Sequence, residues 1–300
     1  MNKKSMFNAM LNKVNGGGVA TYLITLTIAA LTACEKDTVS EELVDSKTIN
    51  FTVAGEFSDR WTPVTRSLTA DGKDMTDIWV LDYVGTELQQ TIHQDDNTAS
   101  DFGTPAITLS YGSHHLYFIA SRGSGATINT TNHTITFTKV LDNFWRELEI
   151  NVVATSNTSQ VINLNRVVTK LKLSFTDPIA EGAATINIIP HTWYYGMNYF
   201  TGEPTAAATD QAVVINIPAS EIGNTIYATV YGFSGADEWT TDISINSKKS
   251  DNTIIGQATI DDAPFVRNRI SEYTGPLFSA GSGMTLTLNT DWSTSYQGTW

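Results

Sequence analysis

The chain has 300 residues, 41% of them hydrophobic, which is enough for about two domains with buried cores and excludes a chain disordered throughout. Its 18 basic and 31 acidic residues give a net charge of −13, which argues against nucleic acid and anionic lipid surfaces as partners, since both are negatively charged. The single cysteine excludes an internal disulfide and a metal site built from several thiolates.

Residues 1–33 have the organisation of an export signal. Three lysines precede the apolar run 19–33 (VATYLITLTIAALTA), which ends in small residues. This run is shorter than the roughly 20 residues that a helix needs to cross a bilayer, and Glu35, Lys36 and Asp37 follow it at once. We therefore expect a signal peptide that is removed, not a stable transmembrane anchor.

The end of this signal, Leu31-Thr32-Ala33-Cys34, resembles the bacterial lipobox, in which cleavage precedes a cysteine that then carries a diacylglycerol. The alternative is an ordinary signal peptide with a cysteine near its cleavage site. Removing residues 1–33 takes away three lysines and no acidic residue, which leaves 15 basic against 31 acidic residues, a net charge of −16. We expect Cys34 to carry palmitate and other acyl chains that hold the protein in the outer membrane, because several acyl chains suffice for stable anchoring.

Residues 34–47 are charged and lack apolar periodicity, which predicts a flexible tether. From Ile49 onward apolar and polar residues alternate, a pattern that predicts strands with one buried face, and no window of 12 or more residues has a helical apolar stripe. In chain order the predicted strands are 49–53, 78–84, 107–109, 116–120, 134–138, 148–153, 171–175, 185–189, 213–217, 225–233, 243–245, 254–260 and 284–288.

This succession of strands predicts an all-β protein with two β-sandwiches in series. The polar stretch 155–160 (TSNTSQ) lies between two sets of strands, so we predict an N-terminal domain over 48–160 and a C-terminal domain over 161–300. The absence of a fixed-period repeat argues against propellers and solenoids.

The sequence offers no convergent set of catalytic groups. It contains no nucleophile elbow, no zinc-protease motif and no phosphate-binding glycine loop. His114 and His115 are neighbours in a predicted strand, so their side chains should leave opposite faces and cannot bind one metal together. The acidic cluster over 95–101 lacks the ligand spacing of a calcium loop and favours a solvated turn. We predict a protein that is not an enzyme and needs no metal or cofactor.

One aromatic stripe could bind a carbohydrate. Trp193, Tyr195, Met197 and Tyr199 occupy alternate positions, so in a strand they would line one face, and such a face can stack on sugar rings. The alternative is that the stripe forms a core face or a contact between domains.

Several segments of the mature chain resemble the fimbrillin superfamily, the lipoprotein subunits of type V pili, and in particular its fimbrial anchor and minor-subunit branch. In order along residues 34–300 they are Thr65-Arg66, 76–83 (TDIWVLDY) with Gly85 and Leu88, 111–121 (YGSHHLYFIAS), 161–171 (VINLNRVVTKL) and 266–270 (VRNRI).

The resemblance implies two transthyretin-like β-sandwiches and a structural subunit of a surface fimbria that contributes to adhesion. Its partners would be other pilus subunits, the outer membrane through the lipid, and a host or bacterial surface receptor. In the family, an arginine-specific protease removes the first strand, and a strand from a neighbouring subunit fills the exposed groove. Anchor subunits are thought to keep their lipid. The alternative function is a surface glycan-binding lipoprotein of the outer membrane.

Carried over to this chain, the family mechanism suggests a processing site and a donor strand. We expect cleavage after Arg66, with Arg60 as the second choice, because the stretch 58–70 contains Pro63 and little apolar alternation, as an exposed connection would. The alternative for Arg66 is an arginine on a solvated loop. The donor would be the C-terminal stretch in which Met284, Leu286 and Leu288 alternate with threonines.

Overall fold

The structure, a computed structural model, describes residues 45–54, 66–67, 75–95, 99–279 and 296–299. In these ranges the only helical element is the three-residue 3-10 turn η1 (Ala219–Glu221), and all other regular elements are strands. None of the helical structure described is long and apolar enough to cross a membrane. The prediction of an all-β fold is confirmed.

The strands follow one another at short intervals, as the alternating sequence predicts. In chain order they are β1 (Ser46–Ala54), β2 (Arg66–Ser67), β3 (Asp77–Val84), β4 (Glu87–Asp95), β5 (Ala106–Ser110), β6 (Gly112–Ser121), β7 (Thr127–Asn129), β8 (Thr134–Thr136), β9 (Asn143–Val152), β10 (Ser159–Asn163), β11 (Asn165–Arg166), β12 (Val168–Phe175), β13 (Thr185–Pro190), β14 (Thr192–Asn198), β15 (Glu203–Thr209), β16 (Val213–Asn216), β17 (Ile226–Phe233), β18 (Trp239–Lys248), β19 (Ile254–Phe265), β20 (Ile270–Gly275) and β21 (Tyr296–Thr299).

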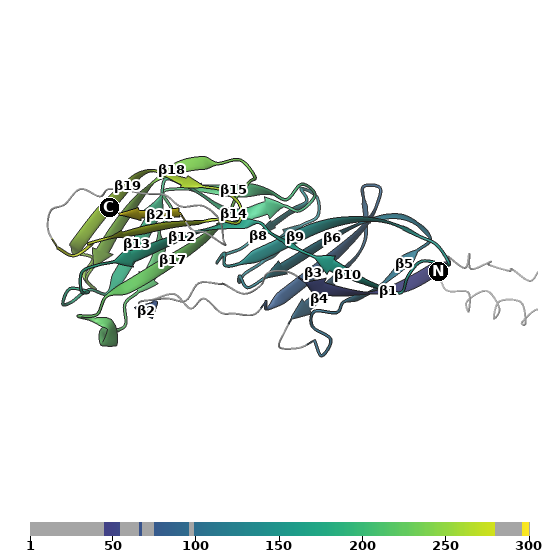
Figure 1. The fold of residues 1–300 in the computed structure, drawn as a ribbon, viewed down its shortest axis with the longest axis horizontal. Coiled ribbons are helices and arrows are strands. Elements are labelled where there is room, and N and C mark those ends of the chain that lie inside the picture. The colour runs from purple at the N-terminus through teal and green to yellow at the C-terminus, as the bar shows by residue number, and fades with distance from the viewer. Residues whose placement is uncertain (1–44, 55–65, 68–74, 96–98, 280–295, 300) are drawn as a thin grey trace, which may run out of the picture. The chain divides into compact units, whose positions relative to one another are not determined.

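The N-terminal strands form one pair of facing sheets (Figure 1). The smaller sheet has the order β10-β1-β5 and the larger the order β11-β9-β6-β3-β4. Alternate residues of each strand point into the space between them, as period-two strands require. Their buried side chains form one core, to which the two sheets contribute Ile49, Phe51, Ile107 and Leu109 on one side and Ile78, Val80, Leu116 and Phe118 on the other.

The C-terminal strands form a second pair of sheets with its own core. One sheet has the order β2-β17-β12-β20-β21 and the other the order β16-β13-β18-β19. The core between them is mostly aliphatic, with four buried aromatic side chains, and its aliphatic part includes Leu171, Leu173, Ile186, Ile188, Val230, Ile243 and Ile245.

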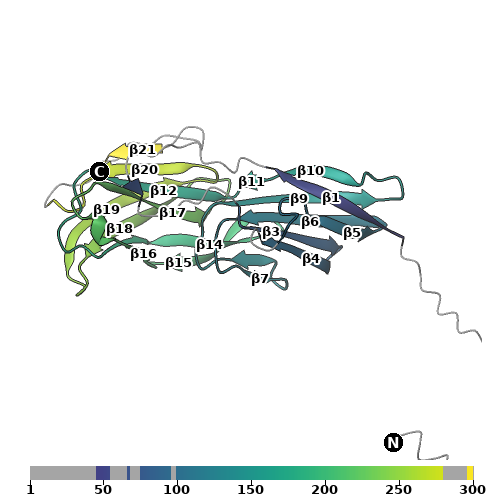
Figure 2. The same cartoon turned by 90° about the horizontal axis from the view of Figure 1, so that it is seen from below.

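A fifth sheet, β15-β14-β8-β7, combines strands from both halves of the sequence (Figure 2). β8 pairs with β14 in an antiparallel ladder, so residues 134–136 hydrogen-bond to residues 196–198. Beside this sheet lies a third apolar cluster, in which Trp79, Leu81 and Tyr83 from β3 meet Met197 and Tyr199. This cluster explains why β3 is buried on both faces and reads as a nearly continuous apolar run.

The structure also shows where the predicted segments end. β1 begins at Ser46, so two residues of the predicted tether 34–47 belong to the first strand. β10 pairs with β1 and β11 with β9, so strands of the N-terminal sheets continue up to Arg166, beyond the boundary predicted after residue 160. The division into two domains stays a prediction. The predicted strand 284–288 lies outside the described residues.

Candidate functional site

The first strand of the described chain is also the central strand of its sheet. β1 pairs with β5 in antiparallel orientation, where Ile49 faces Ile107, and with β10 in parallel orientation, where Val53 faces Ile162. In the described residues β5 and β10 have no other strand partner in that sheet. Without β1 the two flanking strands would therefore no longer be connected by a ladder.

β1 also supplies apolar side chains to the core. Ile49 and Phe51 are 0% exposed, and the Phe51 ring meets Phe118 of the facing sheet edge to face with 5.0 Å between ring centroids. Burial of an aliphatic or aromatic side chain of this size is worth about 1.5–3 kcal/mol. A chain without β1 would thus expose two apolar pockets together with a row of unpaired N–H and C=O groups.

Backbone hydrogen bonds fix β1 on both edges. The Phe51 amide donates to the Pro105 carbonyl at 2.9 Å on the β5 side, and the Asn50 amide donates to the Thr158 carbonyl at 2.9 Å on the β10 side. The amides of odd-numbered β1 residues thus face β5 and those of even-numbered residues face β10. On the outer face, the hydroxyls of Thr48 and Thr108 lie 2.8 Å apart.

Most residues of the predicted processing and assembly sites lie outside the described residues. These are Cys34, Arg60, Met284, Leu286 and Leu288. Arg66 is described: it lies in β2 and pairs with Ile226 of β17 in parallel orientation. At this point the chain is part of a sheet edge and not an unpaired connection, contrary to the expectation for 58–70. Cleavage after Arg66 stays a prediction.

The aromatic stripe lies in the protein core, not on a surface. Trp193 and Tyr199 are 1% and 0% exposed, and Met197 is also fully buried. The Trp193 indole N–H donates to the Tyr231 carbonyl at 3.0 Å, while the Tyr199 and Tyr83 hydroxyls lie 2.8 Å apart. Tyr195 is half-buried and packs beside the same clusters. A glycan platform made of Trp193, Tyr195 and Tyr199 is therefore wrong for this structure, and the alternative of a core face holds.

The tyrosines of this region titrate late because they are buried. Burial raises the pKa of Tyr117 to about 12, and the nearby Glu147 carboxylate contributes to the rise. Burial and the hydrogen bond to Tyr83 raise the pKa of Tyr199 further still. Both side chains pack in the apolar cluster that contains Tyr83 and Met197.

The two adjacent histidines point to opposite faces of β6, as predicted. His114 is buried, and its Nδ1 lies 2.6 Å from Oδ1 of Asp82. His115 lies on the other face, with Nδ1 3.2 Å from Glu147. Among the described residues, no three His, Cys, Asp or Glu side chains are grouped so that they could hold a metal ion.

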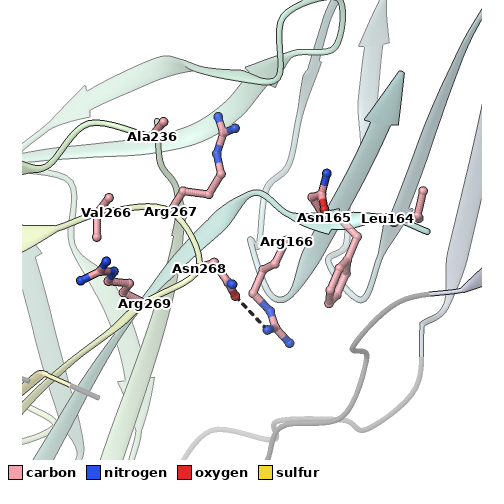
Figure 3. A pocket seen from close by; sticks show the side chains of 9 residues that line it. Leu164, Asn165, Arg166, Ala236, Val266, Arg267, Asn268 and Arg269 are labelled. Atoms are coloured by element: carbon pink, nitrogen blue, oxygen red, sulfur yellow. Dashed lines mark hydrogen bonds between the residues drawn. The ribbon is translucent and has the colours of Figure 1, made fainter. Parts of the chain in front are cut away.

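A pocket of about 440 Å³ is rich in arginine (Figure 3). Its lining includes Arg166, Arg267 and Arg269, but the three guanidinium groups point in different directions. Arg166 forms a two-pronged, buried ion pair with Asp142, at 2.7 and 2.9 Å, and also donates to Asn268. Arg267 donates through Nε to the Ser234 carbonyl at 2.9 Å. These side chains hold loops together and do not converge on one ligand position.

Sequence reasoning missed the role of β10. The polar stretch 155–160 was predicted to mark the domain boundary, yet its last two residues begin a strand whose backbone pairs with β1. Only Ile162 of this strand is buried, and Val161 is 60% exposed, so apolar alternation is weak. The signal that could have found it is the apolar pair Ile162 and Leu164 that continues the same face.

Comparisons with known proteins were made at three levels. No protein-family model matches the chain, and a search of curated proteins finds no match. Among solved structures, the chain is similar to a candidate adhesin from Bacteroides ovatus, with 10% identity over 71% of this chain and 77% of that chain and a TM-score of 0.46. Two proteins of Porphyromonas gingivalis are also similar.

The first is the tip fimbrial protein Mfa3, with 10% identity over 85% of this chain and 99% of that chain and a TM-score of 0.42. The second is the fimbrial anchor protein Mfa2, with 8% identity over 73% and 83% and a TM-score of 0.41.

Proposed function

We propose that this chain is a cell-surface lipoprotein that serves as a structural subunit of a fimbria and joins its neighbours by strand exchange at the position of β1. Export and anchoring would follow from the signal over 1–33 and lipidation of Cys34 in the outer membrane. The partners would be further pilus subunits, which form a homo- or heteropolymer, and a surface receptor contacted by the assembled fibre.

The observation that carries this proposal is the place of β1 in its sheet. It is the N-terminal strand of the described chain, yet it lies between β5 and β10 and fills the core with Ile49 and Phe51. Loss of a terminal strand from a central position leaves an acceptor groove with two ladder edges and apolar pockets, which an extended, alternating strand can fill. A strand with the pattern of residues 284–288 has the required alternation.

The alternative of a glycan-binding lipoprotein has lost its only support, because the aromatic stripe is in the core.

The test is to lock β1 in place. Thr48 and Thr108 are a directly opposite pair with their hydroxyls 2.8 Å apart, and they occupy a non-hydrogen-bonded position, where side chains approach most closely. In the variant Thr48→Cys with Thr108→Cys, a disulfide would tie β1 to β5. Because Cys34 is the single natural cysteine, a mixed pairing is easy to detect.

We expect wild-type cells to show surface fibres by electron microscopy and heat-sensitive polymer ladders on gels, and the oxidised double variant to show neither. Reduction should restore the ladders, and the matched control Thr48→Cys alone should polymerise like the wild type. Full ladders from the completely oxidised variant would overturn strand exchange at β1. Absence of fibres from wild-type cells would overturn the fimbrial assignment itself.

A further inference from the structure

The acceptor groove needs walls that stay in place when β1 is absent, and each of its two walls, β5 and β10, then loses its strand partner in that sheet; the contacts that hold β5 can be followed in the structure. In the described residues its only strand partner is β1. The carbonyls of Ile107 and Leu109 face β1, whereas those of Thr108 and Ser110 point to the opposite edge, because successive residues of a strand alternate in direction. Without a strand partner among the described residues, the groups on this outer edge bond to solvent or to side chains.

Side chains from the facing sheet fill that role. The Gln90 amide nitrogen on β4 donates to the Thr108 carbonyl at 2.7 Å, and His114 Nε2 on β6 lies 2.9 Å from the Ser110 carbonyl and 3.2 Å from the Ser110 hydroxyl. Because a carbonyl oxygen only accepts, the contact with Ser110 is a hydrogen bond in the form of His114 that carries a proton on Nε2. Two of the outward carbonyls of β5, those of Thr108 and Ser110, are thus each contacted by one side chain of the other sheet.

The side chains of Gln90 and His114 both contact one carboxylate. Asp82 of β3 lies 2.6 Å from His114 Nδ1 through Oδ1 and accepts from Gln90 through Oδ2 at 3.2 Å. Asp82 and His114 are each 1% exposed. Asp82, His114 and Gln90 all lie on the inner face of their sheet, in the same rows as Ile78, Val80 and Leu116 of the core. Asp82 and His114 are buried and Gln90 is half-buried, so the carboxylate fixes the direction of both side chains at the border of the core.

We propose that Asp82, His114 and Gln90 form a clamp that holds β5 to the facing sheet from its outer edge, so that the groove keeps its shape when β1 is absent. Asp82 is the positioning residue, and Gln90 and His114 make the contacts. The use of the clamp in accepting a partner strand rests on the proposed function, but its effect on β5 does not. Burying the polar groups of Asp82 and His114 costs desolvation free energy that apolar side chains would not cost. The fixed position of β5 is the structural effect that we assign to this polar network.

Residue-resolved hydrogen exchange on the intact mature chain tests the clamp. The amides of Lys47, Ile49 and Phe51 face β5, and those of Asn50 and Thr52 face β10, so one strand reports on both walls. In Gln90→Ala we expect the β5-facing amides to exchange about tenfold faster, which corresponds to one lost hydrogen bond. The β10-facing amides should change by less than about twofold.

His114→Phe keeps a ring of similar size and should show a larger effect with the same asymmetry. If this variant fails to fold because Asp82 is left without its partner, Gln90→Ala still decides, since Gln90 is only half-buried. The matched control is Gln89→Ala, an exposed neighbour whose side chain donates to the Glu87 carbonyl and not to β5.

A purely structural role would accelerate exchange equally on both edges of β1, and that result would overturn the clamp, as would unchanged exchange in Gln90→Ala. The outcome is independent of polymerisation. Asymmetric exchange in a protein that forms no ladders would refute the fimbrial function and leave the clamp intact. If the wild type forms ladders but exchange in the variants rises equally on both edges of β1, the clamp is refuted and the fimbrial function is left intact.

Discussion

Phe51 is the residue through which β1 contributes most to the N-terminal core, and Phe51→Ala measures that contribution. The side chain is 0% exposed and meets Phe118 across the two sheets. Truncation of a buried phenylalanine to alanine costs about 3–5 kcal/mol, partly from lost transfer free energy and partly from the cavity left behind. This is a large share of the roughly 5–15 kcal/mol that stabilises a typical domain.

The assay is urea unfolding followed by tryptophan fluorescence and circular dichroism. The control Thr52→Ala changes the next residue, which points outward and is exposed, and should alter the free energy of unfolding by less than about 1 kcal/mol. A double-mutant cycle with Phe118→Ala should give a coupling of about 0.5–1.5 kcal/mol for the ring pair. Equal effects of Phe51→Ala and Thr52→Ala would refute the assignment of β1 as a core strand.

The remaining predictions concern attachment, assembly, processing and pH. Cys34→Ser should abolish palmitate labelling and release the protein from the membrane fraction; a labelled, membrane-bound variant would contradict lipidation. Leu286→Asp should abolish polymer ladders while Thr287→Asp, on the other face of the predicted strand, should not. N-terminal sequencing of surface protein should show a start at residue 67 in wild type and not in Arg66→Ala, and a wild-type chain that begins at lipidated Cys34 would indicate an uncut anchor subunit. Burial raises the pKa of Tyr117 to about 12 in the folded chain, against about 10 in the unfolded chain. The contribution of Tyr117 to the free energy of unfolding is therefore complete below pH 10 and is lost as the pH rises towards 12. In that window the melting temperature should fall less steeply in Tyr117→Phe than in the wild type.

Strands with one buried face could be predicted from the sequence because one face packs in the apolar core and the other contacts water, so apolar and polar residues alternate. The alternation of Ile49, Phe51 and Val53 located β1, and the continuous apolar run 78–84 located β3. β4 (ELQQTIHQD) escaped notice because it is an edge strand and mostly exposed, so nothing forces its residues to alternate. β15 was missed for a similar reason, since its alanines and Pro204 carry little strand preference.

The candidate site could be predicted only where local pattern decides it. The opposite directions of His114 and His115 follow from strand geometry alone and are confirmed. The partner of His114 could not be foreseen, because Asp82 is 32 residues away and meets it only through the pairing of β3 with β6. The fate of the aromatic stripe was open for the same reason: alternation shows that side chains share a face, but not whether another sheet covers it.

The shared sheet has a consequence for the order in which the chain can fold during export. A secreted chain emerges from its N-terminus, and β7 and β8 find a partner other than each other only when β14, about sixty residues later, has also emerged. β1 waits still longer for β10. Pairings between strands so far apart close large loops and form slowly. In the export that we propose, the emerging chain would therefore remain incomplete, with apolar strands uncovered, until β10 and β14 have followed, and such uncovered strands favour aggregation.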